Sequence, residues 1–128
     1  MTSSIDRVVQ AHGIEVELVT PGRATARMKV TADMANLHGI AHGGYVFLLA
    51  DTAFAYACNQ GRIALAQAAQ IVFLRPVPIG AELTAVAAER AAAGACGIYD
   101  VTVRTAGGEV VAEFRGQSAA LPRQRGER

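Results

Sequence analysis

The sequence predicts a single α+β domain in which a curved antiparallel sheet wraps around one long buried helix. Strand-like stretches separated by turn residues precede and follow one helical segment, and that segment is apolar nearly all round. Successive hairpins make a sheet antiparallel, and a single buried helix needs a sheet curved around it. The chain of 128 residues, 52% of them hydrophobic, fits one domain. We expect that domain to span residues 1–128, with a flexible basic tail at 122–128.

The first elements are a short helix and a hairpin. Residues 5–11 carry apolar side chains at helical spacing, and Ser3 or Ser4 is available as the cap of that helix. Residues 14–30 alternate between apolar and polar on both sides of a turn at Pro21-Gly22, which predicts a hairpin.

The central helix is predicted over residues 45–58. This segment is apolar except at Asp51 and Thr52, if its two tyrosines are counted as apolar. A helix of this kind must be buried on most of its faces, and it is too short to cross a bilayer.

Four strand-like stretches follow the helix, and turn residues punctuate them. They are residues 67–74, 82–89, 97–105 and 110–121. The alanine-rich part at 81–95 could be helical on propensity alone, but we interpret it as a strand. The sheet that results has edges that a second subunit can cover.

Composition excludes several classes of protein. The formal net charge is +1, and only the C-terminal tail concentrates positive charge, so we expect no nucleic-acid partner. No apolar run reaches the length of about 18 residues that a membrane span needs, and no apolar core of a signal peptide follows Met1, so we expect a soluble cytoplasmic protein that binds no membrane. Cys58 and Cys96 lie in apolar surroundings without metal-ligand spacing, which predicts buried, reduced thiols.

Polar residues with chemical potential gather in one stretch. Asn36, His38, His42 and Asp51 lie within 16 positions, together with a glycine pair at 43–44. The glycines open the central helix, where unpaired N–H groups and the positive end of the helix dipole can stabilise the oxyanion of acyl transfer. The alternative is that they only form a tight loop before a helix.

Asp51 lies in the middle of the apolar helix, where an unpaired carboxylate is costly. It is either a catalytic carboxylate, which attacks a carbonyl or activates water, or a structural acceptor of hydrogen bonds. Eight residues separate it from Gly43, on the order of 12 Å along a helix. One carbonyl cannot touch both residues of one chain, so a shared role requires a twofold dimer.

The two loop histidines have the i, i+4 spacing of a zinc helix, but Gly39 and Gly43 make the loop a poor helix and no third ligand is evident. We therefore expect no metal. His42 either orients a carbonyl and moves protons or only locks the loop through hydrogen bonds. Asn36 either holds a carbonyl or water or forms an Asx turn.

The stretch from Asn36 to Asp51, NLHGIAHGGYVFLLAD, resembles the signature of the PaaI-like hotdog thioesterases, and its continuation TAFAYACN resembles their phenylacetate-degradation subgroup. The resemblance implies the hotdog fold and hydrolysis of an acyl-CoA thioester. It also implies that Gly43 polarises the thioester carbonyl, that Asn36 and His42 arrange substrate and water, and that Asp51 comes from the partner subunit. A homotetramer made from two dimers is implied as well.

The resemblance implies phenylacetyl-CoA or hydroxyphenylacetyl-CoA as the substrate type. Coenzyme A is then part of the substrate, and no separate cofactor is expected. The substrate-binding residues that we expect are Gly44 beside the carbonyl, the aromatic residues of an apolar acyl pocket, and two arginines near the coenzyme phosphates: Gly44, Tyr45, Phe47, Phe54, Arg62 and Arg75.

One departure from the family pattern affects the site. Many relatives place a Ser or Thr on the strand after the helix, near the reacting water, whereas this chain offers only Gln67 or Gln70 there. The role of Asp51 as nucleophile or as general base also stays open. Two rival functions remain, namely a hotdog enoyl-CoA hydratase or dehydratase with His42 as its base, and a non-catalytic acyl-CoA-binding module.

Overall fold

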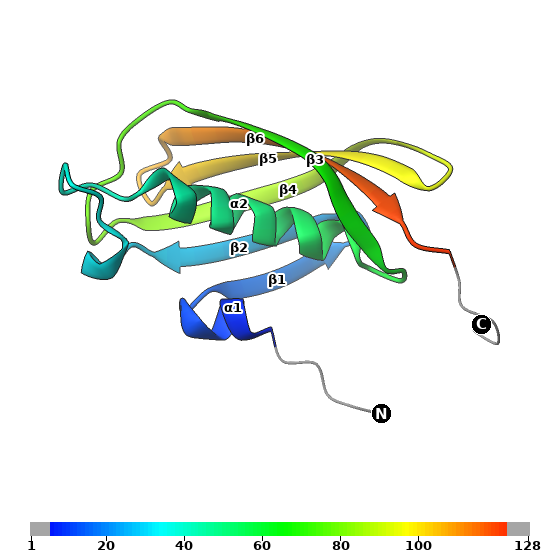
Figure 1. The fold of residues 1–128 in the computed structure, drawn as a ribbon, viewed down its shortest axis with the longest axis horizontal. Coiled ribbons are helices and arrows are strands. Elements are labelled where there is room, and N and C mark those ends of the chain that lie inside the picture. Colours follow the sequence, from blue (N-terminus) through cyan, green and yellow to red (C-terminus); the bar gives the residue numbers. More distant parts are fainter. Residues whose placement is uncertain (1–5, 123–128) are drawn as a thin grey trace.

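The structure is a computed structural model that describes residues 6–122. It contains one six-stranded antiparallel sheet, in the order β1-β2-β4-β5-β6-β3, with one long helix lying against a single face of it (Figure 1). This confirms the predicted α+β class. The elements are α1 (Arg7–Ala11), β1 (Glu15–Thr20), β2 (Arg23–Lys29), the 3-10 turn η1 (Ala32–Met34), α2 (Gly43–Cys58), β3 (Ala64–Phe73), β4 (Glu82–Ala93), β5 (Cys96–Thr105) and β6 (Val110–Ala120).

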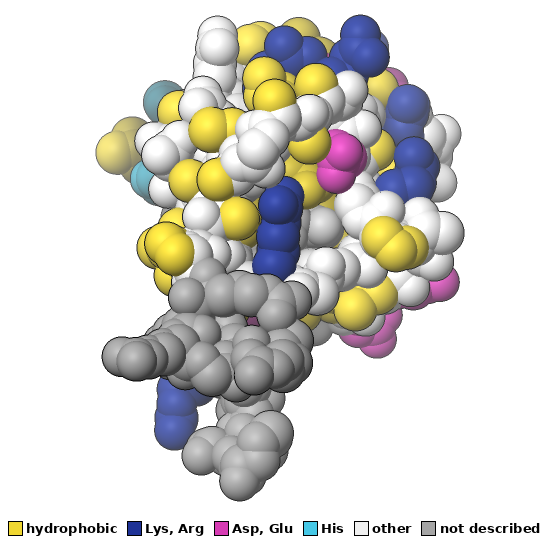
Figure 2. All heavy atoms as spheres, turned by 90° about the vertical axis from the view of Figure 1, so that its right-hand side faces the viewer, with side chains coloured by type: hydrophobic (Ala, Val, Ile, Leu, Met, Phe, Trp, Pro, Cys, Tyr) yellow, Lys and Arg dark blue, Asp and Glu magenta, His cyan; other side chains and the backbone are white. Residues whose placement is uncertain are grey.

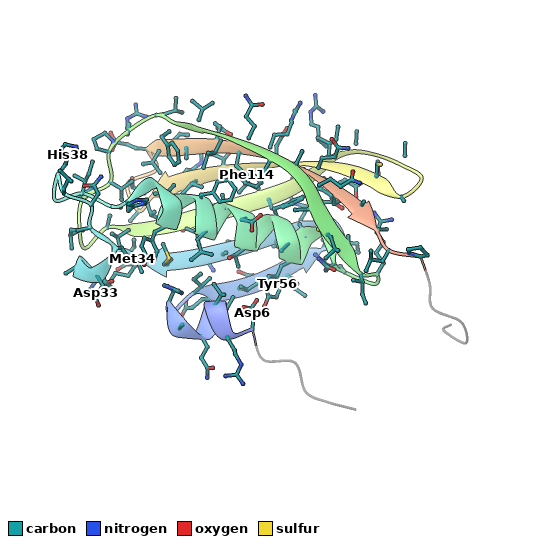
Figure 3. The ribbon with its side chains drawn as sticks, viewed as in Figure 1. Asp6, Asp33, Met34, His38, Tyr56 and Phe114 are labelled. Carbon is teal, nitrogen blue, oxygen red and sulfur yellow. The ribbon has the colours of Figure 1, made fainter. Side chains whose placement is uncertain are left out.

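The short helix α1 is capped by Asp6, whose side chain accepts a hydrogen bond from the Val9 N–H at 3.1 Å. The predicted caps Ser3 and Ser4 lie outside the described residues. Asp6 also accepts a hydrogen bond of 2.8 Å from the Tyr56 hydroxyl of α2, and Figure 3 shows the two side chains facing each other. Burial and the neighbouring Asp6 carboxylate raise the pKa of Tyr56 to about 12. The hydrogen bond between Tyr56 and Asp6 therefore connects α1 to α2.

The predicted hairpin is present as β1 and β2. Gly22 in its turn has φ +80°, which a residue with a side chain rarely adopts. A Cβ at Gly22 would also lie 3.2 Å from Glu89 of β4, so the turn packs closely on its neighbour. In β2 the buried Ala24, Ala26 and Met28 lie under the helix.

The alanine-rich stretch forms the strand β4, as we interpreted it. It pairs with β2 on one side and β5 on the other. Leu83, Ala85 and Ala87 are buried, and they alternate with exposed or half-buried residues. Pairing on both sides and burial of one face outweigh the helix propensity of alanine, because that propensity amounts to a few tenths of a kcal/mol per residue.

Aromatic packing between α2 and the sheet fills the core. The centroid of the Phe54 ring lies 5.6 Å from that of Tyr99, in an edge-on arrangement. It lies 5.7 Å from the centroid of Phe114, whose ring is tilted against it. A Cβ at Gly116 of β6 would lie 2.8 Å from the Phe54 ring, so a glycine is required where the helix approaches the strand most closely. Helix α2 is thereby held firmly over the sheet.

The prediction that both cysteines are buried is wrong for Cys96. Cys58 is buried at the end of α2, but Cys96 is exposed and both are free thiols. Cys96 begins β5 next to the tip of the β4–β5 hairpin, where residues 91–96 are all exposed. Local apolar composition suggested burial, but no other element among residues 6–122 covers this hairpin end.

Large hydrophobic side chains remain at the surface of the single chain. Figure 2 shows the end of the molecule that lies on the right in Figure 1, where hydrophobic side chains are visible among basic ones. Leu65, Val72 and Phe73 of the edge strand β3 are each about half exposed, at 57%, 49% and 52%. Within the described residues, no helix is long and apolar enough to cross a membrane.

Candidate active site at the start of the central helix

The loop before α2 is organised by Asn36. Its side-chain oxygen accepts a hydrogen bond of 2.9 Å from the His38 N–H and a longer one, 3.4 Å, from the Ile40 N–H. This is the Asx turn considered from the sequence, with Gly39 at φ +78° completing the bend. The side-chain NH2 of Asn36 has no acceptor within residues 6–122 and remains able to donate. The two interpretations of Asn36 are therefore compatible.

His42 is the N-cap of α2. Its Nδ1 accepts a hydrogen bond of 2.9 Å from the Gly44 N–H, and its carbonyl oxygen accepts one of 2.9 Å from the Tyr45 N–H. A ring nitrogen that accepts carries no proton, so this hydrogen bond places the proton of a neutral His42 on Nε2. A Cβ at Gly44 would lie 3.1 Å from Nδ1, which explains the small residue there. The Gly44 N–H is thus committed to the cap and is not available to a substrate.

The Gly43 N–H, unlike that of Gly44, makes no hydrogen bond to the cap. It is the first amide of α2, and no acceptor for it is found among the described residues. Gly43 borders an open groove of about 330 Å3, which is within the range of small-molecule sites. The walls of this groove come from the Asn36 loop, the start of α2 and the segment after β3: Asn36, Ile40, Ala41, Gly43, Val46, Phe73, Leu74, Arg75, Pro76 and Val77.

Asp51 lies on the one face of α2 that the sheet leaves uncovered. Gly44 is exposed and Leu48, Asp51 and Ala55 are half-buried, whereas most other helix residues are fully buried. Burial raises the pKa of Asp51. No described residue donates a hydrogen bond to its carboxylate or forms a salt bridge with it. Residues 6–122 of one chain therefore offer no structural partner for this carboxylate.

Helix α2 is continuous from Gly43 to Cys58, so the helical separation assumed from the sequence applies. Eight residues at 1.5 Å each place Gly43 and Asp51 about 12 Å apart along the axis. Only Asn36 and Gly43 of the four predicted catalytic residues border the groove, while His42 forms the cap beside it.

The three aromatic residues that we expected to line an acyl pocket lie on different sides of α2. Phe54 is 1% exposed and belongs to the core, so the prediction that it contacts substrate is corrected. Tyr45 packs against His12 at 5.6 Å, on the side of α2 that faces α1. Phe47 is half-buried and edge-on to Phe114 at 5.4 Å, next to the uncovered helix face. Periodicity could not distinguish these three faces because the helix is apolar all round.

The two predicted arginines lie near opposite ends of α2. Arg75 borders the Gly43 groove, and its guanidinium donates a hydrogen bond of 2.6 Å to the Val110 carbonyl oxygen, which leaves further N–H groups free to bind an anion. Arg62 is exposed in the turn that follows the far end of the helix. Of these two arginines, Arg75 is the one that borders the groove within one chain.

Neither glutamine of β3 reaches this side of the sheet. Gln70 lies opposite Arg115, and together they line a shallow hollow on the face away from α2. Gln67 accepts a hydrogen bond from Gln117 at 3.2 Å, close to the irregularity between Ala66 and Ala68. The sequence-based suggestion that one of them replaces the auxiliary Ser or Thr is therefore not supported by their placement in this chain.

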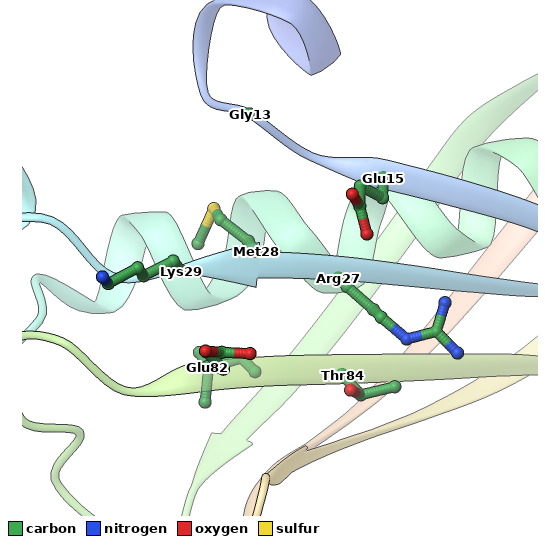
Figure 4. Close-up of a pocket in the computed structure, with 8 residues that line it drawn as sticks. Gly13, Glu15, Arg27, Met28, Lys29, Glu82 and Thr84 are labelled. Atoms are coloured by element: carbon green, nitrogen blue, oxygen red, sulfur yellow. The ribbon is translucent and has the colours of Figure 1, made fainter.

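Two other features lie apart from the groove. His38 is exposed at the outer end of its loop (Figure 3), and residues 6–122 contain no group of three or more potential metal ligands. A second hollow, of about 220 Å3, lies across β1, β2 and β4 (Figure 4). Its charged side chains are two acids and two bases, Glu15, Glu82, Arg27 and Lys29, so their formal charges cancel.

Among the groove residues that were not predicted from the sequence, one is aromatic. Phe73, the last residue of β3, lies with its ring against Gly43, since a Cβ at Gly43 would be 3.2 Å from Phe73 Cζ. The apolar run before Arg75-Pro76 predicted a strand but carried no sign of this contact. The approach of two segments 30 positions apart is set by the sheet.

Comparison with known proteins gives a consistent result. The family model of the thioesterase superfamily matches residues 38–112. The chain is 46% identical to the acyl-coenzyme A thioesterase PaaI of Escherichia coli over 114 residues, 88% of this chain and 81% of that protein. It is 34% identical to a putative esterase of Deinococcus radiodurans, over 88% of this chain and 77% of that protein.

Solved structures agree with these sequence relatives. The E. coli PaaI protein from the phenylacetic acid degradation operon superimposes with a TM-score of 0.89 and 45% identity, covering 91% of this chain and 86% of that one. The protein TT0310 of Thermus thermophilus superimposes with a TM-score of 0.88 and 37% identity, covering 92% of this chain and all of that one.

Proposed function

The chain belongs to the thioesterase superfamily, and on that premise we propose that it hydrolyses acyl-CoA thioesters with an aryl-acetyl group. It has the hotdog fold and is a thioester hydrolase. The proposed acyl class rests on its similarity to a thioesterase from a phenylacetic acid degradation operon. We place the protein in the cytoplasm and expect it to need no separate cofactor and no metal.

The observation that carries the proposal is the Gly43 N–H at the wall of the groove, for which residues 6–122 provide no acceptor. An amide at a helix N-terminus carries part of the positive end of the helix dipole, and it stabilises the oxyanion that forms when a thioester carbonyl is attacked. The free NH2 of Asn36 borders the same groove and supplies a second donor, to the carbonyl or to the attacking water.

We assign the catalytic carboxylate to Asp51 of the partner subunit. Asp51 is about 12 Å along the helix from Gly43, and it lies on the helix face that the sheet leaves uncovered. A twofold axis that sets two α2 helices antiparallel brings Gly43 of one protomer opposite the other protomer's Asp51. That axis passes beside Phe47, midway between the two positions, so each dimer has two equivalent sites.

The edge strand β3 supports the dimer. Its sequence, ALAQAAQIVF, contains no charged residue, whereas the other edge strand, β1, contains Glu15 and Glu17. A long uncharged edge invites pairing with another strand, and charged side chains discourage it. We propose that β3 pairs with its copy across the twofold axis, and that two such dimers form a tetramer.

In the proposed reaction, Asp51 acts as the general base. Its raised pKa makes the carboxylate a better proton acceptor than an ordinary aspartate. It takes a proton from water while the water oxygen attacks the thioester carbon, whose carbonyl oxygen becomes the oxyanion at Gly43. Collapse of this intermediate breaks the carbon–sulfur bond, the Asp51 proton passes to the leaving thiolate, and the free acid and the thiol of coenzyme A result.

Arg75 is the residue that we propose to bind a phosphate of coenzyme A. The hydrogen bond from its guanidinium to the Val110 carbonyl oxygen fixes the orientation of the side chain. Its remaining N–H donors lie at the edge of the groove. Arg62 can reach the same substrate only if the assembly brings the far end of a neighbouring α2 close to the groove.

The rival hydratase function needs His42 to accept a proton. In this structure Nδ1 already accepts from Gly44, and Nε2 carries the proton, so the ring can donate but not accept until its cap is broken. The rival functions also differ in their products. A hydratase consumes an enoyl-CoA without releasing a thiol, and a non-catalytic binding module leaves every thioester intact.

The test is subunit complementation, read as thiol release from phenylacetyl-CoA. Asp51→Asn removes the base, and Gly43→Pro removes the oxyanion donor at a helix position that tolerates proline. Each homo-oligomer is expected to lose activity, by about 100-fold or more. Co-expressed, doubly tagged hetero-oligomers are expected to recover a large part of it, because one of their two sites keeps both groups.

Absence of recovery in a correctly assembled hetero-oligomer would overturn the shared site while leaving thioester hydrolysis intact. No thiol release by the wild type from phenylacetyl-CoA or from straight-chain acyl-CoAs would overturn the proposed substrate class.

A further inference from the structure

The position of Phe73 is unusual for a large aromatic side chain. It is 52% exposed, although it lies opposite the fully buried Ala112 on the face of the sheet that carries α2. Most large aromatic side chains on that face are core residues, such as Phe114 at 2% exposure. Phe73 therefore presents apolar surface to the groove and not to the core.

The ring of Phe73 lies next to Gly43, the residue whose N–H we propose to bind the thioester carbonyl. A Cβ at Gly43 would lie 3.2 Å from Cζ and 3.4 Å from Cε1, so the tip of the ring rests against the Gly43 backbone. A carbonyl oxygen bound to the Gly43 N–H, at about 2.9 Å, holds its carbon within a few ångströms of that ring. The group attached to the carbonyl carbon must then pass beside Phe73.

The rest of the groove lacks any comparable surface. Its other walls are aliphatic or polar, and Phe73 is the one aromatic side chain among the residues that line it. Aromatic rings prefer offset or edge-on contact with other rings, which adds to the gain from burying apolar area. An aliphatic chain gains only the burial.

We propose that Phe73 is the residue that selects the acyl group, by packing its exposed ring against an aryl group one methylene away from the reacting carbonyl. This inference rests on the proposed function, because it takes Gly43 as the amide that holds the thioester. It assigns to Phe73 a contact with the acyl group, distinct from the roles of Gly43, Asn36 and Asp51 in the chemistry.

The experiment compares kcat/KM for phenylacetyl-CoA, hexanoyl-CoA and acetyl-CoA in the wild type, Phe73→Leu and Phe73→Ala. Leucine keeps an apolar side chain but removes the ring, and alanine removes both. The matched control is Val72→Ala, on the opposite face of the same strand and similarly exposed at 49%. Size-exclusion chromatography and thermal unfolding establish that each variant keeps its fold and assembly.

We expect Phe73→Leu to lower kcat/KM for phenylacetyl-CoA by about 3- to 10-fold, with a change of less than about 2-fold for acetyl-CoA. Phe73→Ala is expected to lower kcat/KM for phenylacetyl-CoA further. It should also lower kcat/KM for hexanoyl-CoA, because the apolar surface that an aliphatic chain buries is lost as well. Val72→Ala should keep the wild-type order of substrates.

Equal losses on all three thioesters would overturn the inference, since a general structural role would produce them. So would an unchanged preference in both Phe73 variants. The failure of the proposed function has a separate signature, because the wild type itself would then release no thiol from any of the three thioesters.

Discussion

The two ends of α2 differ in how their free backbone groups are hydrogen-bonded. At the C-terminal end, Asn59 donates from Nδ2 to the carbonyl oxygens of Ala55 and Ala64, at 2.8 and 3.1 Å, and accepts from the Ala64 N–H at 2.8 Å. At the N-terminal end, His42 caps Gly44, and the Gly43 N–H has no acceptor in the described part of the chain. One end is closed by its own side chains, and the other is left open towards a groove.

This difference separates structure from function along a single helix. A side chain that satisfies a helix end contributes to stability, whereas an unsatisfied amide beside a groove costs some stability and can bind a ligand atom. Substitutions at the open end should therefore change activity more than folding, and substitutions at the closed end should do the reverse. Asp51 lies between the two ends, and its substitution should also change activity more than folding.

The largest expected effect is at the open end. Gly43→Pro should lower kcat for thioester hydrolysis by about 100- to 1000-fold, because it removes the N–H that we propose as an oxyanion donor. Stability should change little, since His42 has φ −63° and ψ 133°, which suits the residue before a proline, and Gly43 is the first helical residue. Gly43→Ala is the control, as it keeps the N–H but introduces the same contact with Phe73. An equal loss in both variants would assign the effect to crowding of Phe73 and not to the amide.

The closed end should show the reverse pattern. Asn59→Ala is expected to lower the free energy of unfolding by about 1–3 kcal/mol, because it leaves the backbone groups of Ala55 and Ala64 without their side-chain partners. Urea unfolding at a fixed protein concentration measures this. The matched variant Gln60→Ala loses a single hydrogen bond, to the Arg23 carbonyl oxygen, and should cost less. A large fall in kcat for Asn59→Ala at a temperature where it is fully folded would contradict the comparison.

The smallest expected effect concerns the stability of Asp51→Asn. Burial raises the pKa of Asp51 above its ordinary 3.8, so the folded chain binds a proton more tightly than the unfolded chain does. The ionised carboxylate therefore reduces stability: this cost is absent well below pH 3.8, grows as the pH rises above 3.8 and is complete above the raised pKa. Asp51→Asn should therefore unfold at a slightly higher temperature than the wild type at pH 7, and the difference should be small because this group is only half-buried.

Thermal unfolding of both proteins from pH 7 down to pH 3 measures this difference, which should shrink as the pH falls. A wild type that is more stable than Asp51→Asn at pH 7 would indicate that Asp51 has a stabilising partner in the assembly, and would favour its structural role.

Local sequence determined the order of the elements and the content of the site loop. Alternation, turn residues and a long apolar run act over a few positions, so the β1–β2 hairpin, α2 and the later strands were all predicted from them. The spacing of Gly43 and Asp51 on one helix is also a local quantity, which is why the sequence alone required two subunits for a site that uses both. The resemblance of residues 36–51 to a known signature then agreed with the fold and family that were found.

Which of these residues lie close together depends on how the strands and the helix pack. A helix that is apolar all round gives no sign that Phe54 faces the core while Phe47 lies beside the uncovered face. The contact of Phe73 with Gly43, the separation of Arg62 from Arg75, the outward placement of Gln70 and the exposure of Cys96 all depend on strand register and on how far each strand extends past the helix. These are relations between segments distant in the chain, and no periodicity within one segment encodes them.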